Sequence, residues 1–486
     1  MDAQTRPAFA SSRLSPLERG LRLFTDVRAG EGMTGLILFA DVFLVLCAYY
    51  FAKAVRDGWI AVSEVAGLSQ VELKAYTSFG QSLLLWPIVS VYARLSARWP
   101  RRTLITRVTL VCMATLVLFW FLQPGVVFTK LPAAGVAFYL WVGMFGLFVV
   151  AQFWTFAADL YAGERGGRLL PLIAIGATAG AAFGSFLTHA LLHSGLVDSG
   201  MLLLIAIVPL AGSIVLIRLA DARGPLGTPR AERTKPTSPA VADAPVGKGA
   251  LAMIAQYRYL MAVALVAMLT NWVITNGENL LFRVVQESLR DELVAHAIVG
   301  ADAVRRFVRD GTTAFYGNYF FWVNLCALLA QSLLASRLLR YGGVGAVLLL
   351  LPLISLVAYS TMALLPILAV VRVMKIGENA TNYSIDNTAR QVIWLPTTSE
   401  MKYWTKPAID SLFVRLGDGM AALTVFVGVQ LVELTTTALC LVNVALVACW
   451  LPAAIAIVRE HRRLMAVGVS ASSAAASRRD VASELC

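Results

Sequence analysis

The chain has 486 residues, of which 58% are hydrophobic and only 14% are charged, and its formal net charge is +12. Soluble domains usually carry about 25% charged residues, so this composition excludes an ordinary soluble protein and indicates several helices embedded in a lipid bilayer. The excess of Arg and Lys is typical of membrane-protein loops beside anionic lipid, and we expect no nucleic-acid partner.

Windows long enough to cross a membrane recur along the chain. A basic tail at 1–33 lacks the apolar core of a signal peptide, so we expect it to be cytoplasmic. Six spans then make up a predicted N-terminal bundle over 34–220, at about 34–56, 76–97, 103–122, 134–158, 170–192 and 199–219.

A polar, proline-rich segment at 221–256 interrupts the hydrophobic pattern and predicts a flexible cytoplasmic linker. Six further spans make up a predicted C-terminal bundle over 257–458, at about 257–283, 315–338, 343–364, 366–392, 406–432 and 435–457. The last segment, 459–486, is rich in Ala, Ser and Arg, and we expect a disordered cytoplasmic tail.

The positive-inside rule orients these spans. Arg and Lys gather in the loops after spans 2, 4, 6, 8 and 10, whereas the long charged loop at 284–313 has nearly balanced charge and is expected on the opposite side. Both termini are therefore predicted to be cytoplasmic. Two six-helix halves joined by a cytoplasmic linker predict an all-α membrane protein of about 12 spans, similar to the major facilitators, with a cavity between the halves.

The span at 366–392 carries more charge than a plain membrane helix tolerates. At 100° per residue, one stripe collects polar side chains: Arg372, Lys375, Asn379, Asn382, Tyr383, Asp386 and Arg390. Charge at bilayer depth normally faces the interior of the helix bundle or a watery cavity, so this stripe predicts a polar path. Pairs within the helix, such as Arg372 or Lys375 with Glu378 and Asp386 with Arg390, are a purely structural alternative.

Three other spans add candidate site residues. Lys53 and Arg56 lie in the first span beside Asp57, Glu278 lies deep in the seventh, and the eleventh begins with the pair Lys406 and Asp410. Snorkelling at the membrane boundary is an alternative for Lys53, Arg56 and Asp57, and a positive-inside anchor is one for Lys406. The excess of cations favours an anionic small-molecule solute, while Glu278 would hold a proton, repel the wrong charge or pair with a cavity lysine.

Other classes of function find little support in the sequence. The six cysteines are scattered, five of them in hydrophobic spans, and the four histidines are dispersed, so no metal site and no cofactor are expected. The chain lacks a GxxxxGK[ST] loop, which argues against an ATP-driven pump. The sequence also shows no nucleophile and base constellation, so we expect neither catalytic residues nor an enzyme.

The segment 382–423 reads NYSIDNTARQVIWLPTTSEMKYWTKPAIDSLFVRLGDGMAAL, and it resembles the signature of the nucleotide transporter family, the ATP/ADP translocases of plastids and obligate intracellular bacteria. YYFAKAVRDGWIAV at 49–62 and FWTFAADLY at 153–161 are similar to two further family motifs. The sequence departs from the family pattern at Val142, where the family has a glutamate, and at Asp418, where a glycine-rich motif has lysine.

The resemblance implies a secondary transporter that exchanges ATP and ADP across a bacterial inner membrane by alternating access. The resemblance places family charges at Arg56, Glu278, Lys402 and Lys406. In the nucleotide hypothesis Arg56, Lys375 and Lys406 hold phosphates, Arg372 and Arg390 shape the cavity potential, and Glu278 serves coupling or selectivity. Two alternatives remain open: a transporter of the same fold for another anionic or phosphorylated metabolite, and a membrane sensor or scaffold that does not transport.

Overall fold

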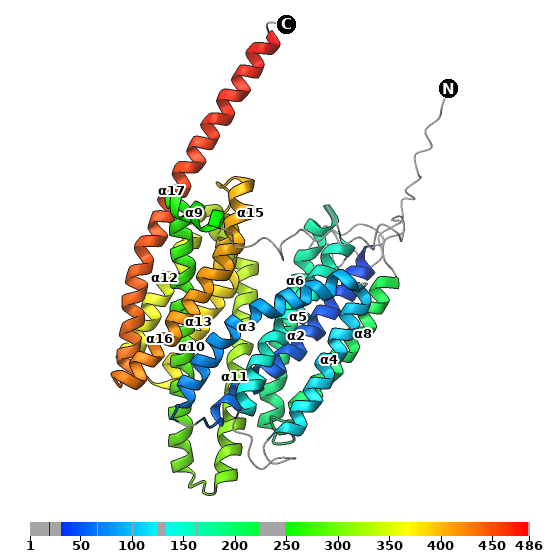
Figure 1. Cartoon of the computed structure of the whole chain (residues 1–486), viewed down its shortest axis with the longest axis vertical. Coiled ribbons are helices and arrows are strands. Elements are labelled where there is room, and N and C mark those ends of the chain that lie inside the picture. Colours follow the sequence, from blue (N-terminus) through cyan, green and yellow to red (C-terminus); the bar gives the residue numbers. More distant parts are fainter. Residues whose placement is uncertain are drawn as a thin grey trace.

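The computed structural model describes residue 19 and the ranges 31–65, 67–99, 101–123, 133–161, 164–222 and 248–484. Within these ranges the chain is helical and contains no β-strand. The helices run roughly parallel to one long axis and form two bundles side by side (Figure 1). Most of the predicted N-terminal tail and most of the predicted linker lie outside the described residues.

The first bundle contains six long helical segments, and their boundaries lie close to those of the predicted spans. They are α2 (Gly32–Ala61), α3 (Gln70–Arg98), α4 (Arg101–Leu122), α5 (Ala134–Leu160), α6 (Glu164–His193), and α7 (Met201–Ile205) continued by α8 (Ile207–Ala222). Helix α2 packs against α5, α6 and α8, so it forms the centre of this bundle.

Close packing of α2 on α6 depends on glycines spaced whole turns apart. A Cβ atom at Gly176 would lie 2.8 Å from the carbonyl oxygen of Phe39, and one at Gly184 would lie 2.6 Å from that of Cys47. Larger side chains would therefore push the two backbones apart. Small residues at such spacings are a common means of helix association in membranes.

The second bundle contains the remaining six long helical segments, three of which are interrupted by π-helical turns. Its elements are α9 (Lys248–Gln256), α10 (Arg258–Ala295), α11 (Ala301–Ala330), η2 (Gln331–Ala335), α12 (Ser336–Leu364), α13 (Leu368–Thr381), η3 (Asn382–Asp386), α14 (Asn387–Val392), α15 (Ser399–Ala408), η4 (Ile409–Phe413), α16 (Val414–Phe426), η5 (Val427–Leu431) and α17 (Thr436–Glu484). Helix α10 contacts α11, α13, α16 and α17, and it occupies the place that α2 has in the first bundle.

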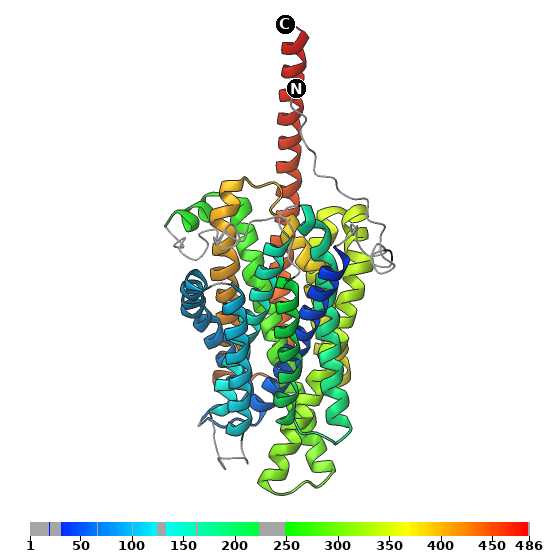
Figure 2. The same ribbon diagram turned by 90° about the vertical axis from the view of Figure 1, so that its right-hand side faces the viewer.

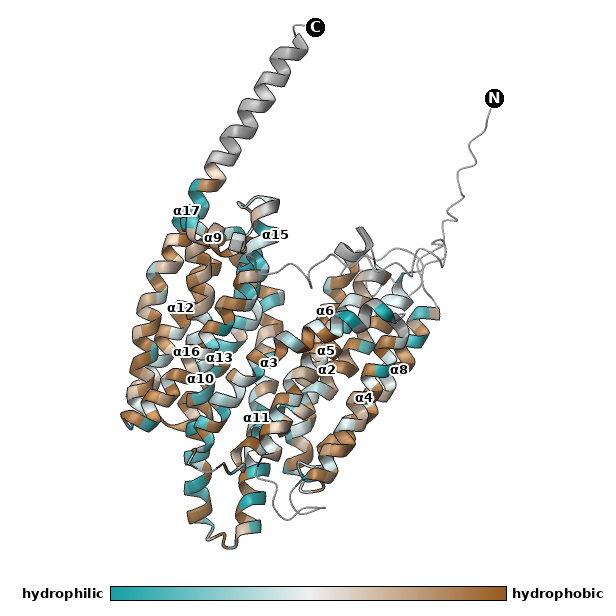
Figure 3. Ribbon diagram, viewed as in Figure 1, coloured by the Kyte–Doolittle hydropathy of each residue, from teal (hydrophilic) through white to brown (hydrophobic). Residues whose placement is uncertain are grey.

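Among the described residues, nine helical stretches are long and apolar enough to cross a membrane. One of them, 301–364, contains both α11 and α12, while α3 and the α13–η3–α14 segment fall outside that criterion. Together these segments give the predicted two sets of six. Hydrophilic residues are prominent where α10 and α11 project beyond the rest of the bundle (Figure 3).

Two segments differ from their sequence-based predictions. Residues 284–313, expected as a loop, are mostly helical, because α10 continues to Ala295 and α11 begins at Ala301. We call the projecting end formed by 284–313 the hairpin end (Figures 1 and 2). Helix α17 also continues through the predicted disordered tail to Glu484, as the high helix propensity of its Ala and Arg residues allows. It extends, with α9, at the opposite end, which we call the linker end.

The two bundles contact each other toward the hairpin end. Helices α2, α3 and α6 of the first bundle pack against α10, α11 and α16 of the second. At Gly58 the approach is so close that a Cβ atom would lie 2.5 Å from the carbonyl oxygen of Arg309 on α11. Nearby, Ser199 Oγ donates to Asp310 at 2.5 Å, and Arg309 forms an ion pair with Asp198 at 3.4 Å. These contacts hold the bundles together at that end.

Candidate functional site

A buried ion cluster lies in the middle of the second bundle and is centred on Lys375 of α13. The Lys375 ammonium forms an ion pair with Glu378, one turn along the same helix, and lies 3.7 Å from Oε1 of Glu278 on α10. The side chains of Lys375 and Glu378 are fully buried, whereas that of Glu278 is 27% exposed. Of the alternatives given for Glu278, pairing with a lysine is the one that this ion pair matches.

Neutral polar groups complete the cluster. Ser355 Oγ and Tyr359 Oη of α12 donate to the two oxygens of Glu378 at 2.8 and 3.0 Å. Asn379 Nδ2 donates to Oε1 of Glu278 at 2.5 Å, and Tyr319 Oη of α11 donates to the same atom at 3.4 Å. Buried charges are costly unless their remaining hydrogen-bonding capacity is satisfied, so these four helices are held in a specific arrangement.

The cluster requires a glycine on α10. A Cβ atom at Gly277 would collide with the Tyr359 hydroxyl and would lie 2.5 Å from the Lys375 ammonium. The bare backbone of α10 thus leaves the space that these two polar groups occupy. Glycine at this point explains how a fully buried lysine fits between three helices.

A second ion cluster lies at the boundary of the two bundles. Asp57 of α2 is buried and forms ion pairs with Arg56 at 3.2 Å and with Lys74 of α3 at 3.1 Å. Lys74 Nζ also donates to Tyr316 Oη of α11, in the other bundle, at 3.1 Å. The snorkelling alternative would place Asp57 in contact with solvent. Asp57 is instead buried between its two cations.

Lys53 of α2 lies between aromatic rings from both bundles. Its ammonium is 4.1 Å from the ring centroid of Phe320, 4.9 Å from that of Tyr50 and 5.9 Å from that of Tyr383. The Arg56 guanidinium lies 4.2 Å from the ring of Tyr139 on α5. Such contacts stabilise a cation through the negative face of the ring, and they leave it able to take an anionic partner.

The other predicted residues of the span 366–392 have partners of their own. Arg372 donates a hydrogen bond to Asn318 on α11 and does not pair with Glu378. Arg390 pairs with Asp386 at 2.7 Å, as the structural alternative predicts, and its side chain is 44% exposed. Arg372, Asp386 and Arg390 all belong to the predicted stripe, yet their partners differ from those of Lys375.

The residues after span 10 lie toward the linker end and do not reach the central clusters. Lys406 donates to Gln391 at 3.1 Å and not to its predicted neighbour Asp410. Lys402 and Asp410 are exposed. The structure therefore pairs Glu278 with Lys375 and places Lys53 and Arg56 on α2, where Lys53 lies beside rings of both bundles. The other candidates stay predictions without a shared geometry.

The departure from the family pattern at Asp418 marks a contact between the bundles. Ser82 of α3 donates to Asp418 of α16 at 2.5 Å, and Asn271 of α10 donates to its other oxygen at 2.5 Å. Arg415 lies 3.1 Å from the Asp418 carboxylate and 3.1 Å from the Ser82 hydroxyl. A lysine at this position would not accept these three hydrogen bonds.

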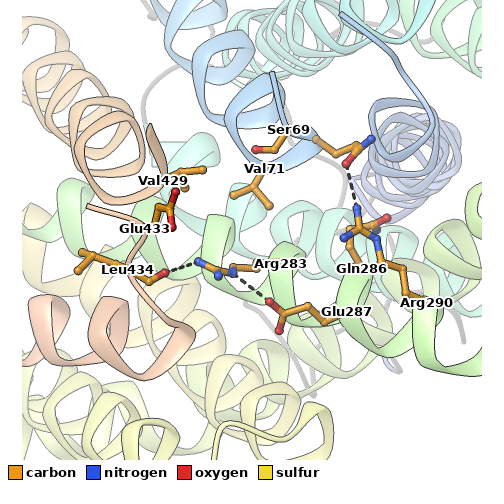
Figure 4. A pocket seen from close by; sticks show the side chains of 10 residues that line it. Ser69, Val71, Arg283, Gln286, Glu287, Arg290, Val429, Glu433 and Leu434 are labelled. Carbon is orange, nitrogen blue, oxygen red and sulfur yellow. Dashed lines mark hydrogen bonds and ion pairs between the residues drawn. The ribbon is translucent and has the colours of Figure 1, made fainter. Parts of the chain in front are cut away.

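A separate pocket of about 390 Å³ opens between the bundles at the hairpin end (Figure 4). Arg283 pairs with Glu287 at 3.0 Å, and Arg290 donates to Gln70 of the first bundle at 3.3 Å. Both arginines of this pocket already have polar partners, whereas the ammonium of Lys53 lies against aromatic rings. Within the described residues, no three His, Cys, Asp or Glu side chains are grouped to hold a metal ion.

Several residues of the central region were not among the candidates. Lys74 was missed because the second span was predicted to begin near 76, whereas α3 begins at Gln70. The tyrosines were missed because an aromatic residue in an apolar span has the same pattern whether it lies in the core or beside a cation. Glu378 had a usable signal, since it lies one turn from Lys375.

Comparison with solved structures identifies the architecture. A mutant form of the nucleoside transporter NupG aligns with a TM-score of 0.60 at 15% identity, covering 87% of this chain and 99% of NupG. A POT family transporter in complex with 5-aminolevulinic acid aligns with a TM-score of 0.57 at 12% identity, covering 89% of this chain and 96% of the other.

This chain has the major-facilitator fold. The human organic anion transporter MFSD10 also aligns, with a TM-score of 0.50 at 14% identity, over 87% of this chain and 98% of that protein. No protein-family model matches the chain, and no curated protein matches it by sequence. At these identities the likeness concerns the fold, so the solute must be argued from the central residues.

Proposed function

We propose that this protein is a secondary transporter for an anionic solute of the nucleotide class, moved by alternating access between the two bundles. The observation that carries the proposal is the position of Lys53, whose ammonium is surrounded by aromatic rings of both bundles. A nucleotide offers a phosphate for such a cation and a flat base for such rings.

The charges of the first bundle support an anion. Asp57 is shared by Arg56 and Lys74, so this cluster keeps one positive charge in excess, and Lys53 on the same helix adds another. An anion placed near Lys53 would interact with both excess charges. The neighbours of the same fold include transporters whose names specify nucleosides and an organic anion, which agrees with this class of solute.

The arrangement of the bundles suits an alternating-access cycle. The contacts between them lie toward the hairpin end, and the linker end is predicted to be cytoplasmic. This conformation would then be the one closed to the outside. We further propose that the protein resides in a bacterial inner membrane with both termini in the cytoplasm, and that ATP and ADP are the first solutes to test, because the sequence resemblance implies their exchange.

A second candidate, a transporter for another anionic or phosphorylated metabolite, is favoured by Asp418. The family pattern has lysine where this chain uses a carboxylate to join α3, α10 and α16. One cation fewer in this region would suit a less highly charged solute than ATP. The two candidates differ in solute and share the mechanism.

The test is counterflow in proteoliposomes that contain the purified full chain. Vesicles are loaded in turn with unlabelled ATP, ADP, AMP, adenosine or inorganic phosphate, and entry of the same labelled compound is followed. We expect counterflow of at least one nucleotide. Counterflow of phosphate alone would support the second candidate, and counterflow of none of these compounds by folded protein would refute the nucleotide proposal.

A matched pair of variants tests the role of Lys53. Replacing a cation that contacts phosphate removes a charged hydrogen bond worth about 1.5–3 kcal/mol. K53Q should therefore raise the solute concentration that gives half-maximal transport roughly tenfold to a hundredfold. R306Q, an exposed cation at the hairpin end, is the control and should leave transport unchanged. Equal behaviour of the two variants would remove Lys53 from the solute site.

A further inference from the structure

Two of the four histidines lie together on α6, at the boundary between the bundles. His189 and His193 are four residues apart, and their ring centroids lie 5.8 Å apart with the ring planes inclined by 18°. Residues at this spacing are neighbours on one face of a helix. His193 is the last residue of α6 and is exposed, so ions dissolved at the hairpin end have access to its ring.

A hydrogen bond between the bundles determines which nitrogen of His189 carries the proton. Its Nδ1 atom lies 3.2 Å from the carbonyl oxygen of Ala314 on α11. A carbonyl oxygen can only accept, so Nδ1 donates, and the neutral ring then has an unprotonated Nε2 atom. Histidines that bind metal ions typically have this arrangement, in which one ring nitrogen binds the ion and the other donates to a carbonyl or carboxylate oxygen.

The spacing of the pair is that of a metal site on one helix. Two histidines at this spacing bind zinc on the helices of metalloproteases. Tetrahedral zinc with bonds of about 2.0–2.1 Å requires two ligand nitrogens roughly 3.3 Å apart. Rings whose centroids lie 5.8 Å apart can reach that separation by rotation about their side-chain bonds. Water then completes the coordination of the ion, as it does in other zinc sites with an open position.

We propose that His189 and His193 form a site for one divalent transition-metal ion of the zinc class, and that the bound ion holds the two bundles together at the hairpin end. The step involves only coordination: each imidazole donates a nitrogen lone pair to the ion, and no covalent bond of the protein breaks. Metal binding and closure are properties of the fold, so they do not depend on which solute the protein carries.

The contact with Ala314 explains why the ion would favour closure. Helices α6 and α11 approach closely here, since a Cβ atom at Gly317 would lie 3.1 Å from the backbone nitrogen of His189. A metal ion on Nε2 keeps the proton of His189 on Nδ1, where it is donated to Ala314. Separation of the bundles at the hairpin end breaks this hydrogen bond. Metal binding and closure therefore favour each other by the same factor.

The first test measures binding of Zn²⁺ alone to the full chain, purified in detergent with a tag that contains no histidine. At a hundred times its dissociation constant for the wild type, Zn²⁺ should raise the midpoint of thermal unfolding by about 5–10 °C. Mg²⁺ should cause no shift, because it prefers oxygen ligands.

Matched histidine variants locate the bound ion. H193Q should keep the metal-free midpoint, because the side chain is exposed, and should lose the shift caused by Zn²⁺. H296Q removes another exposed histidine of the hairpin end and should keep the shift. Absence of a shift in the wild type, or a shift of the same size in H193Q, would overturn the site.

The second test measures closure by hydrogen exchange of backbone amides, without transport. Zn²⁺ should slow exchange over 186–199 and 308–318 in the wild type and leave it unchanged in H193Q. Binding without slower exchange on α11 would overturn the closure and leave the metal site intact. In proteoliposomes that show ADP counterflow, external Zn²⁺ should inhibit the wild type and H296Q and spare H193Q. Equal inhibition of H193Q would overturn the assignment of the inhibitory ion to this pair.

Discussion

Removal of Lys375 should destabilise the protein strongly. In a K375M variant the side chain keeps a similar length, but the two carboxylates that face the ammonium lose their only shared cation. Lys375 and Glu378 are both fully buried, so water cannot replace the lost ion pair. Breaking a buried ion pair by removing one partner typically costs about 3–5 kcal/mol.

This loss of unfolding free energy can be converted into a shift of the melting temperature. For a bundle of about this length, a loss of 1 kcal/mol lowers the midpoint of thermal unfolding by about 2–4 °C, so K375M should melt about 6–20 °C below the wild type. The double variant K375M/E378Q removes both members of the pair, and it should recover most of the loss because the fully buried carboxylate of residue 378 is then no longer charged. Glu278 keeps the hydrogen bonds from Asn379 and Tyr319.

The measurement is thermal unfolding of the detergent-solubilised protein, completed as a double-mutant cycle with E378Q. The control is R463Q, which breaks an ion pair with Glu460, one turn away on α17, in which both side chains are exposed. Exposed pairs contribute about 0–1 kcal/mol, so the control should melt within a few degrees of the wild type. Equal midpoints for K375M and R463Q, or a double variant no more stable than K375M, would refute the argument from burial.

Three further predictions use the same protein preparations. G277A should lower the melting midpoint, because its Cβ would contact Lys375 and Tyr359. At Gly377 a Cβ would meet no atom within 4 Å, so G377A should be neutral or stabilising by about 0.5–1 kcal/mol. D57N should abolish counterflow in folded protein, because Arg56 and Lys74 lose their shared anion; unchanged counterflow would argue against this cluster. Y383A should weaken solute binding by about 0.5–2 kcal/mol in calorimetry, and Y383F should not, because the ring is the group that faces Lys53.

The sequence predicts the all-helical fold and the two sets of spans, because hydrophobic windows define both bundles. A charged stripe in an otherwise apolar chain singles out Lys375, and the spacing of one turn offers Glu378 as its partner. The tertiary partners were less accessible: the pairing of Asp57 with Lys74 depends on how two consecutive spans are placed, and no local pattern encodes it. The same limit applies to Arg372, whose hydrogen bond to Asn318 competes with the intrahelical partner expected from spacing.

Local patterns also fail where one residue type serves two purposes. Phe320 and Tyr50 have the spacing of ordinary core residues, and only the fold shows that both rings face Lys53. The loop expected at 284–313 illustrates a different limit, because charge argues against membrane burial but does not argue against helix. Composition predicts where a segment lies, whereas helix propensity and packing decide its structure.

The distribution of contact types across the molecule bears on how the bundles could move. Within the second bundle, Lys375 is held by charged partners in full burial, an arrangement that is costly to break. Between the bundles the central contacts are mostly single hydrogen bonds: Tyr50 to Asn324 at 3.1 Å, Lys74 to Tyr316 at 3.1 Å and Ser82 to Asp418 at 2.5 Å. Such bonds contribute about 0.5–3 kcal/mol each, and water entering from the hairpin end would replace them. These central contacts are therefore easier for water to replace than the buried pair of Lys375 and Glu378, as the proposed alternating-access cycle requires.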